Sequence, residues 1–145
     1  MTDPNIEKAD PFIGTWKLAP DACAYEHGEV PTDGICEIRT DVDQYLIRVR
    51  LENEAGEVVR ETTVFTYPDG IAREMPEDAT VPGNRFSLTR MDLQTLDEQL
   101  LTNDALVRFT RRVVSDDENM LSVTETNTTP DGDKYTNKTV YARVV

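Results

Sequence analysis

The sequence predicts an all-β fold, a single antiparallel up-and-down β-barrel of about eight to ten strands. Short segments rich in β-branched and aromatic residues alternate between apolar and polar positions, and no stretch keeps the period of an amphipathic helix. Turn residues separate these segments, so consecutive strands are expected to be antiparallel neighbours. Closing the sheet into a barrel removes its unpaired edges, and a flat sandwich is the alternative.

The strands follow one another along the whole chain. They are expected at Ile13 to Leu18, Ile35 to Thr40, Tyr45 to Asn53, Glu57 to Tyr67, Ile71 to Arg73, Arg85 to Met91, Thr95 to Leu101, Leu106 to Val114, Met120 to Thr128 and Lys134 to Val144. Tight turns are expected at Ala55-Gly56, Asp69-Gly70, Pro82-Gly83-Asn84 and Asp131-Gly132.

The length and charge of the chain narrow the possible functions. Its 145 residues suit one domain with one core, with residues 1–11 as a flexible tail and residues 12–145 as the barrel. The 15 Lys and Arg against 28 Asp and Glu give a formal net charge of -13. Nucleic acid is therefore not an expected partner, because binding a phosphate backbone requires cationic side chains.

The chain begins with a polar, acidic stretch and contains no run of about 18 apolar residues, so a cytoplasmic protein without a membrane span is expected. In a reducing compartment Cys23 and Cys36 are expected to be free thiols. His27 is the only histidine, which argues against a histidine-rich metal site. No phosphate loop, nucleophile elbow or dinucleotide fingerprint is present, so neither a metal nor a cofactor is expected.

Both ends of the barrel sequence carry a resemblance. Phe12 to Leu18, with its Gly-x-Trp step, resembles the first strand of fatty-acid-binding proteins and other calycins, and Lys138 to Val144 resembles their last strand. The resemblance implies a tryptophan, Trp16, that closes one end of the barrel. In that family an Arg-x-Tyr pair on the last strand binds the fatty-acid carboxylate. Here Thr139 occupies the arginine position and only Tyr141 matches, and the stretch between the first two long strands is too short for the family's two-helix lid.

A closer resemblance, over nearly the whole chain, is to a group of small bacterial lipocalin-like proteins whose function is unassigned. It rests on Gly14 to Leu18, on the spacing of Pro20, Cys23, Tyr25, Gly28 and Pro31, on the Tyr67-Pro68-Asp69-Gly70 turn, on Arg111 to Ser115 and on Val140-Tyr141. The resemblance implies the barrel fold and brings no activity with it.

One charged residue interrupts an apolar row that is expected inside the barrel. In Leu106 to Val114 the more apolar row consists of Val107, Phe109, Arg111 and Val113. A hairpin turning through Ser115 to Asn119 would pair Arg111 with Val123 and place Glu125 diagonally opposite. If the last strand has the family's orientation, Tyr141 also points inward, so Arg111, Glu125 and Tyr141 are expected to cluster.

Two interpretations of this cluster remain open. As a small-molecule site, Arg111 would contact an anionic or carbonyl group and Tyr141 would donate a hydrogen bond, with Glu98 and Arg90 joining the interior. Phe109 is then either a core residue or part of the wall of the site. As a structural feature, Arg111 and Glu125 form a salt bridge that fixes the register, or a one-residue slip turns the strand over.

The predicted function is binding of a small apolar or amphipathic molecule inside the barrel, with the oligomeric state left open. The first alternative is a cofactor-independent isomerase, cyclase or lyase. In it Glu125 or Glu98 would act as a base with a raised pKa, and Arg111 or Tyr141 would stabilise negative charge on an oxygen. The second alternative is a structural or interaction barrel with a filled interior.

Overall fold

The chain forms one curled antiparallel sheet. The structure is a computed structural model that describes residues 10–75, 85–129 and 131–145. Within them the 11-stranded sheet has the order β5-β4-β3-β1-β11-β10-β9-β8-β7-β6, and β2 pairs with β11. Strands that follow one another along the chain lie side by side and the first pairs with the last, so the predicted up-and-down architecture is confirmed.

The strands lie where the turn residues place them. They are β1 (Gly14–Leu18), β2 (Ala24–Tyr25), β3 (Asp33–Asp41), β4 (Gln44–Glu52), β5 (Val58–Thr66), β6 (Arg73–Glu74), β7 (Arg85–Asp92), β8 (Thr95–Thr102), β9 (Ala105–Val114), β10 (Met120–Thr128) and β11 (Lys134–Arg143). The sequence does not predict β2 or the 3-10 turn Pro20–Ala22 before it. The expected turn at Pro82-Gly83-Asn84 and residues 1–9 of the expected tail lie outside the described residues.

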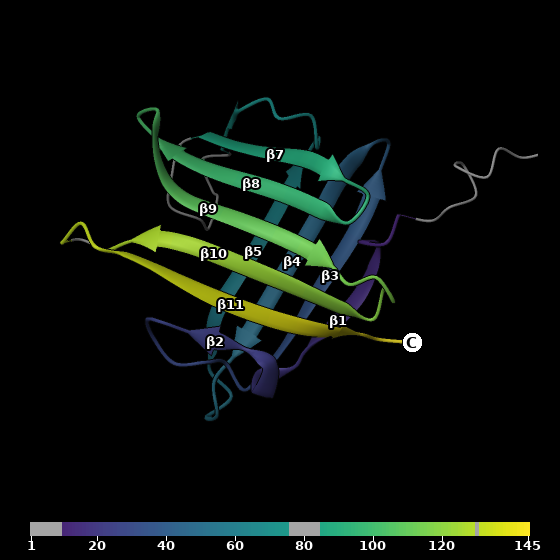
Figure 1. Ribbon diagram of the computed structural model, residues 1–145, viewed down its shortest axis with the longest axis vertical. Helices are drawn as coiled ribbons and strands as arrows, with labels where there is room; N and C mark the ends of the chain where they lie inside the picture. Colours follow the sequence, from purple (N-terminus) through teal and green to yellow (C-terminus); the bar gives the residue numbers. More distant parts are fainter. Residues whose placement is uncertain (1–9, 76–84, 130) are drawn as a thin grey trace, which may run out of the picture.

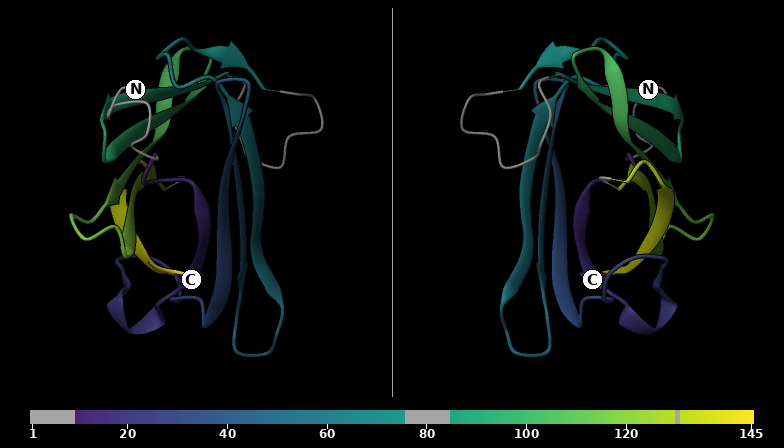
Figure 2. Two further views of the ribbon diagram at one scale, coloured as in Figure 1. Left: turned by 90° about the vertical axis from the view of Figure 1, so that its right-hand side faces the viewer. Right: turned by 90° about the vertical axis from the view of Figure 1, so that its left-hand side faces the viewer.

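The sheet bends into two facing walls. Strands β7 to β11 cross in front of β3 to β5 in Figure 1, and the side views in Figure 2 show the two groups facing each other. β1 joins the walls along one side, because it pairs with both β3 and β11. Along the other side β5 and β6 end the strand order, and the described residues form no ladder between them.

The apolar rows of the strands meet between the walls. In β4, Tyr45, Ile47 and Leu51 are buried, and the arginines between them, Arg48 and Arg50, are exposed, as the alternation predicts. Trp16 on β1 is completely buried, as expected.

Strand β9 presents the opposite face to the one predicted. Val123 of β10 pairs with Arg112 of β9, one residue away from the expected pairing of Val123 with Arg111. The hairpin causes this shift because it closes on Ser115, whose N–H donates to the Met120 carbonyl over 2.9 Å.

The one-residue shift exchanges the two rows of β9. Its buried residues are Arg108, Thr110, Arg112 and Val114. Arg111 is exposed and directly opposite Thr124, so the expected cluster of Arg111 with Glu125 inside the barrel is wrong. The slip considered for this strand is the arrangement that the structure has.

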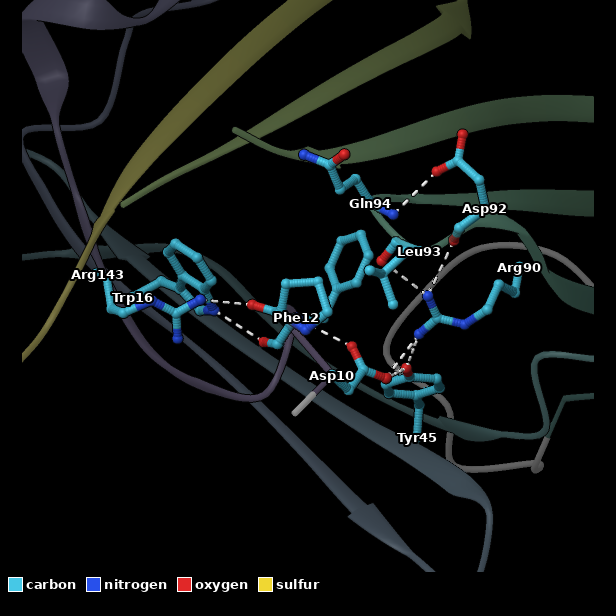
Figure 3. A network of polar contacts seen from close by, with 10 residues as sticks. Asp10, Phe12, Trp16, Tyr45, Arg90, Asp92, Leu93, Gln94 and Arg143 are labelled. Carbon is cyan, nitrogen blue, oxygen red and sulfur yellow. Dashed lines mark hydrogen bonds and ion pairs between the residues drawn. The ribbon is translucent and has the colours of Figure 1, made fainter. Parts of the chain in front are cut away.

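The residues that precede β1 are bound to side chains of β4 and β7 (Figure 3). The Asp10 carboxylate accepts a hydrogen bond from Arg90 Nη2 at 2.6 Å, and the Tyr45 hydroxyl contacts both groups. Phe12 is completely buried beside them. Asp10 and Pro11, which the sequence assigns to the flexible tail, are thus fixed to the barrel.

Candidate functional site

Several charged and hydroxylic side chains meet in the interior between the two walls. Strand β9 supplies Arg108, Thr110 and Arg112; the neighbouring strands supply Glu98 (β8), Glu125 (β10) and Tyr141 (β11); and the opposite wall supplies Arg60 (β5). All except Thr110 line one cavity, together with apolar side chains such as Val49 and Leu51. We call these seven residues the interior cluster.

Alternating charges connect the arginines and glutamates of the interior cluster. Arg60 donates two hydrogen bonds to Glu125, with Nη2–Oε1 and Nη1–Oε2 distances of 2.7 and 2.9 Å. Arg112 Nη1 donates to Glu98 Oε1 at 2.6 Å. Between these two tight pairs, Arg108 has looser ion pairs, 3.5 Å from Nε to Glu125 and 3.8 Å from Nη2 to Glu98.

The inner row of β9 carries polar atoms that make no hydrogen bond within the described residues, and Arg108 Nε has only its 3.5 Å ion pair with Glu125. Arg108 Nε, Thr110 Oγ1 and Arg112 Nε are the buried side-chain polar atoms without a hydrogen-bond partner in the described part of the chain. Each belongs to a residue that is less than a tenth exposed. An unpaired buried donor costs about 1–3 kcal/mol, so each of these atoms needs an acceptor, and Arg108 and Arg112 both line the cavity.

Tyr141 adds a further donor to this cavity. It is buried, and burial raises its pKa well above the ordinary value for tyrosine, so its hydroxyl keeps its proton. Beside it the Thr139 hydroxyl is bonded to the Tyr25 hydroxyl of β2 at 2.8 Å. Thr139, which stands where the family's carboxylate-binding arginine would be, therefore joins β2 to the barrel.

The electrostatics favour binding of an anion over base catalysis. The cavity wall carries three arginines and two glutamates, so it has an excess of positive charge. Burial raises the pKa of Glu125, but the hydrogen bonds and charge of Arg60 outweigh burial and lower it. A carboxylate held ionised in this way is a poor general base, since catalytic carboxylates have raised pKa values.

The cavity is small in the structure as it stands. Its volume is about 30 Å³, where one water molecule needs about 10–15 Å³ in the same measure. Pockets for organic ligands are commonly about 300–1,000 Å³. A larger ligand can therefore enter only if side chains of the interior cluster move.

The structure brings together three of the residues predicted for the site and separates the other three. Glu98, Glu125 and Tyr141 line the cavity. Arg111 lies on the outer face, where it binds Asp97 and its guanidinium lies 5.8 Å from the centre of the Phe109 ring. Arg90 faces the end of the barrel, where it binds Asp10 and the Asp92 and Leu93 carbonyls (Figure 3).

The three arginines of the cavity are absent from the predicted site, although the sequence contains a signal for one of them. Leu51 is expected inside, and in the structure its partner across the hairpin, which has a register shift between Leu51 and Glu52, lies on the same face. That partner is Arg60. Arg108 and Arg112 could be found only with the correct register of β9.

The comparisons with known proteins point to one fold. No protein-family model and no curated protein sequence matches the chain. Among solved structures, the zebrafish ileal bile acid-binding protein complexed with cholic acid matches with a TM-score of 0.59 at 15% identity, covering 92% of this chain and 99% of that one. A mutant of the REP1-NXSQ fatty acid transporter matches with a TM-score of 0.54 at 13% identity, covering 94% of this chain and 100% of that one.

The chain has the calycin fold. Identities this low establish the fold alone, and the calycin fold hosts many different binding functions. Within the described residues no helix has the length and apolar character of a membrane span.

Proposed function

We propose that this calycin binds a small amphipathic molecule inside the barrel, with an anionic group of the molecule at the inner row of β9. The Nε donors of Arg108 and Arg112 carry the proposal, because they have no hydrogen-bond partner and both residues line a cavity that already has excess positive charge. Tyr141 is a further donor on the same side. The apolar residues around the cluster suit the apolar part of such a molecule.

The fold neighbours support the same kind of ligand. One is described as a bile acid-binding protein in complex with cholic acid and the other as a fatty acid transporter. Both ligands join an apolar body to an acidic group. This calycin lacks the Arg-x-Tyr pair of the fatty-acid-binding proteins, so the proposal assigns the anionic group to the arginines of β9 instead.

Two fluorescent probes test the proposal because they share an aromatic body and differ in charge. Anilinonaphthalene sulfonate carries an anionic group, and phenylnaphthylamine does not. We expect the sulfonate to bind with about one site per chain and at least tenfold more tightly than the neutral probe, the worth of one hydrogen bond to a charged group. Fluorescence titration measures both affinities.

Two variants locate the binding site. Arg108→Met removes a guanidinium from the cavity and is expected to weaken sulfonate binding about tenfold or more. Arg111→Met is the matched control, because it removes a guanidinium from the outer face of the same strand. The proposal fails if the wild-type protein binds neither probe, or if both variants bind the sulfonate as the wild type does.

A further inference from the structure

The interior contains an ion pair that joins the two walls. Arg60 lies on β5 and Glu125 on β10, which are separated in the sheet by β4, β3, β1 and β11. Their walls face each other in Figure 2, so the two hydrogen bonds of 2.7 and 2.9 Å cross the interior. This contact fills space that a ligand inside the barrel would need.

The Glu125 carboxylate presents to the arginines the same group that an anionic ligand would present. Its two oxygens bind the fork of the Arg60 guanidinium, and Oε1 also lies 3.5 Å from Arg108 Nε. A ligand carboxylate, sulfonate or phosphate can make the same paired contacts. Two anions cannot occupy one guanidinium fork, so Glu125 and such a ligand compete for Arg60.

Of the two glutamates that line the cavity, Glu125 is the one whose side chain can move away from its arginine partner. The Glu98 side chain is 3% exposed, and Arg112 holds it at 2.6 Å. The Glu125 side chain is 14% exposed and that of Arg60 is 32% exposed, so this pair lies toward solvent. Asn127 Nδ2 already donates to Glu125 at 3.4 Å and offers the carboxylate another partner.

We infer that Glu125 is an internal competitor, whose carboxylate occupies the place of the ligand's anionic group between Arg108 of β9 and Arg60 and closes the cavity until a ligand displaces it. The inference rests on the proposed function and adds its regulation: the contact between Glu125 and Arg60 that the ligand replaces holds the two walls together. The cavity is therefore small because it is closed, and it enlarges when the two walls are released from each other.

Removing the charge of Glu125 tests the inference. Glu125→Gln has nearly the same shape but no longer competes as an anion, so the affinity for anilinonaphthalene sulfonate is expected to rise about tenfold. Glu61→Gln is the control: it removes a glutamate that follows Arg60 on β5, on the wall opposite Glu125, and breaks a pair with Arg50 on the outer surface. The control should bind the sulfonate as the wild type does, and neither substitution should favour the neutral phenylnaphthylamine over the sulfonate.

The outcomes separate the inference from the proposed function. If the wild type prefers the sulfonate but Glu125→Gln binds it no more tightly, the inference is wrong and the proposed function stands. If none of the proteins binds either probe, the proposed function fails and the inference fails with it. If Glu125→Gln does not fold, Glu125→Asp replaces it in the test. The shorter side chain binds Arg60 less well, so this variant must also raise the affinity for the sulfonate.

Discussion

Arg112 on β9 and Glu98 on β8 form an ion pair of 2.6 Å in which both side chains are less than a tenth exposed. Burial opposes the charge on Arg112, but the charge and hydrogen bond of Glu98 outweigh it and raise the pKa of Arg112. The pair is thus a buried one in which each charge depends on the other.

Arg112→Met is expected to lower the free energy of unfolding by about 3 kcal/mol, because it leaves Glu98 with only the loose contact of Arg108. The double variant with Glu98→Leu is expected to recover most of this loss, since apolar groups that replace a buried pair are often neutral or stabilising. Urea unfolding measures both free energies of unfolding.

Arg50→Met, which breaks an exposed ion pair, is the control and should lower the free energy of unfolding by less than about 1 kcal/mol. A double variant less stable than Arg112→Met would contradict this account.

Arg111→Met tests which face of β9 points into the barrel. Arg111 pairs with Asp97 on the outer surface, with Nε–Oδ1 and Nη2–Oδ2 distances of 2.8 Å. We therefore expect the substitution to change the urea midpoint far less than Arg112→Met does, and to leave probe binding unchanged. A large loss of stability on Arg111→Met, with a small one on Arg112→Met, would show that β9 has the register predicted from the sequence.

The sequence was sufficient for the positions of the strands, because turn residues and alternation act locally. It was insufficient for the register between β9 and β10, because the loop from Ser115 to Asn119 can close in two ways that differ by one residue. The structure takes the closure with Glu118 at a φ of 62°, a left-handed conformation uncommon for glutamate. That single choice decides whether Arg111 or Arg112 lies inside.

Part of the cavity lining could be predicted from the sequence, because local turn patterns determine which way some rows of side chains point. Glu125 and Tyr141 belong to rows whose direction the last hairpins set. The partner of Glu125, however, is Arg60, 65 residues away and on the opposite wall. No local pattern connects two strands that face each other across a barrel, so this contact required the folded structure.

The stability of the protein is expected to depend on pH through Glu125. Its pKa is lower in the folded protein than the value of about 4.3 in an unfolded chain. The unfolded state then binds more protons in acid, so the contribution of Glu125 is fully present above about pH 5 and is lost as the pH falls through the lowered pKa.

Urea unfolding over a series of pH values measures this dependence. The wild type should exceed Glu125→Gln in stability at neutral pH, and the two should converge in acid. Glu61→Gln, altered on the outer surface, is the control and should follow the wild type. A difference between wild type and Glu125→Gln that stays constant from neutral pH to about pH 2 would contradict the pKa assignment.

The residues before β1 are expected to control access to Trp16, the only tryptophan. Its Nε1–H donates to the Phe12 carbonyl at 3.0 Å, and the Arg143 guanidinium lies 4.1 Å from the centre of its ring (Figure 3). Phe12 is in turn held by Asp10, whose Oδ1 accepts from the Phe12 N–H at 3.0 Å while Oδ2 binds Arg90. Breaking the contacts of Asp10 should therefore make the ring of Trp16 more accessible to solvent.

Asp10→Asn removes the charge that holds Arg90 while keeping a hydrogen-bonding side chain. We expect acrylamide to quench the fluorescence of Trp16 several-fold more efficiently in this variant, and the free energy of unfolding to fall by about 1–3 kcal/mol, the worth of a hydrogen bond between charged groups. Asp41→Asn, an exposed substitution at the end of β3, is the control and should leave quenching unchanged. Equal quenching in Asp10→Asn and the wild type would mean that Phe12 and Arg143 cover Trp16 without the help of Asp10.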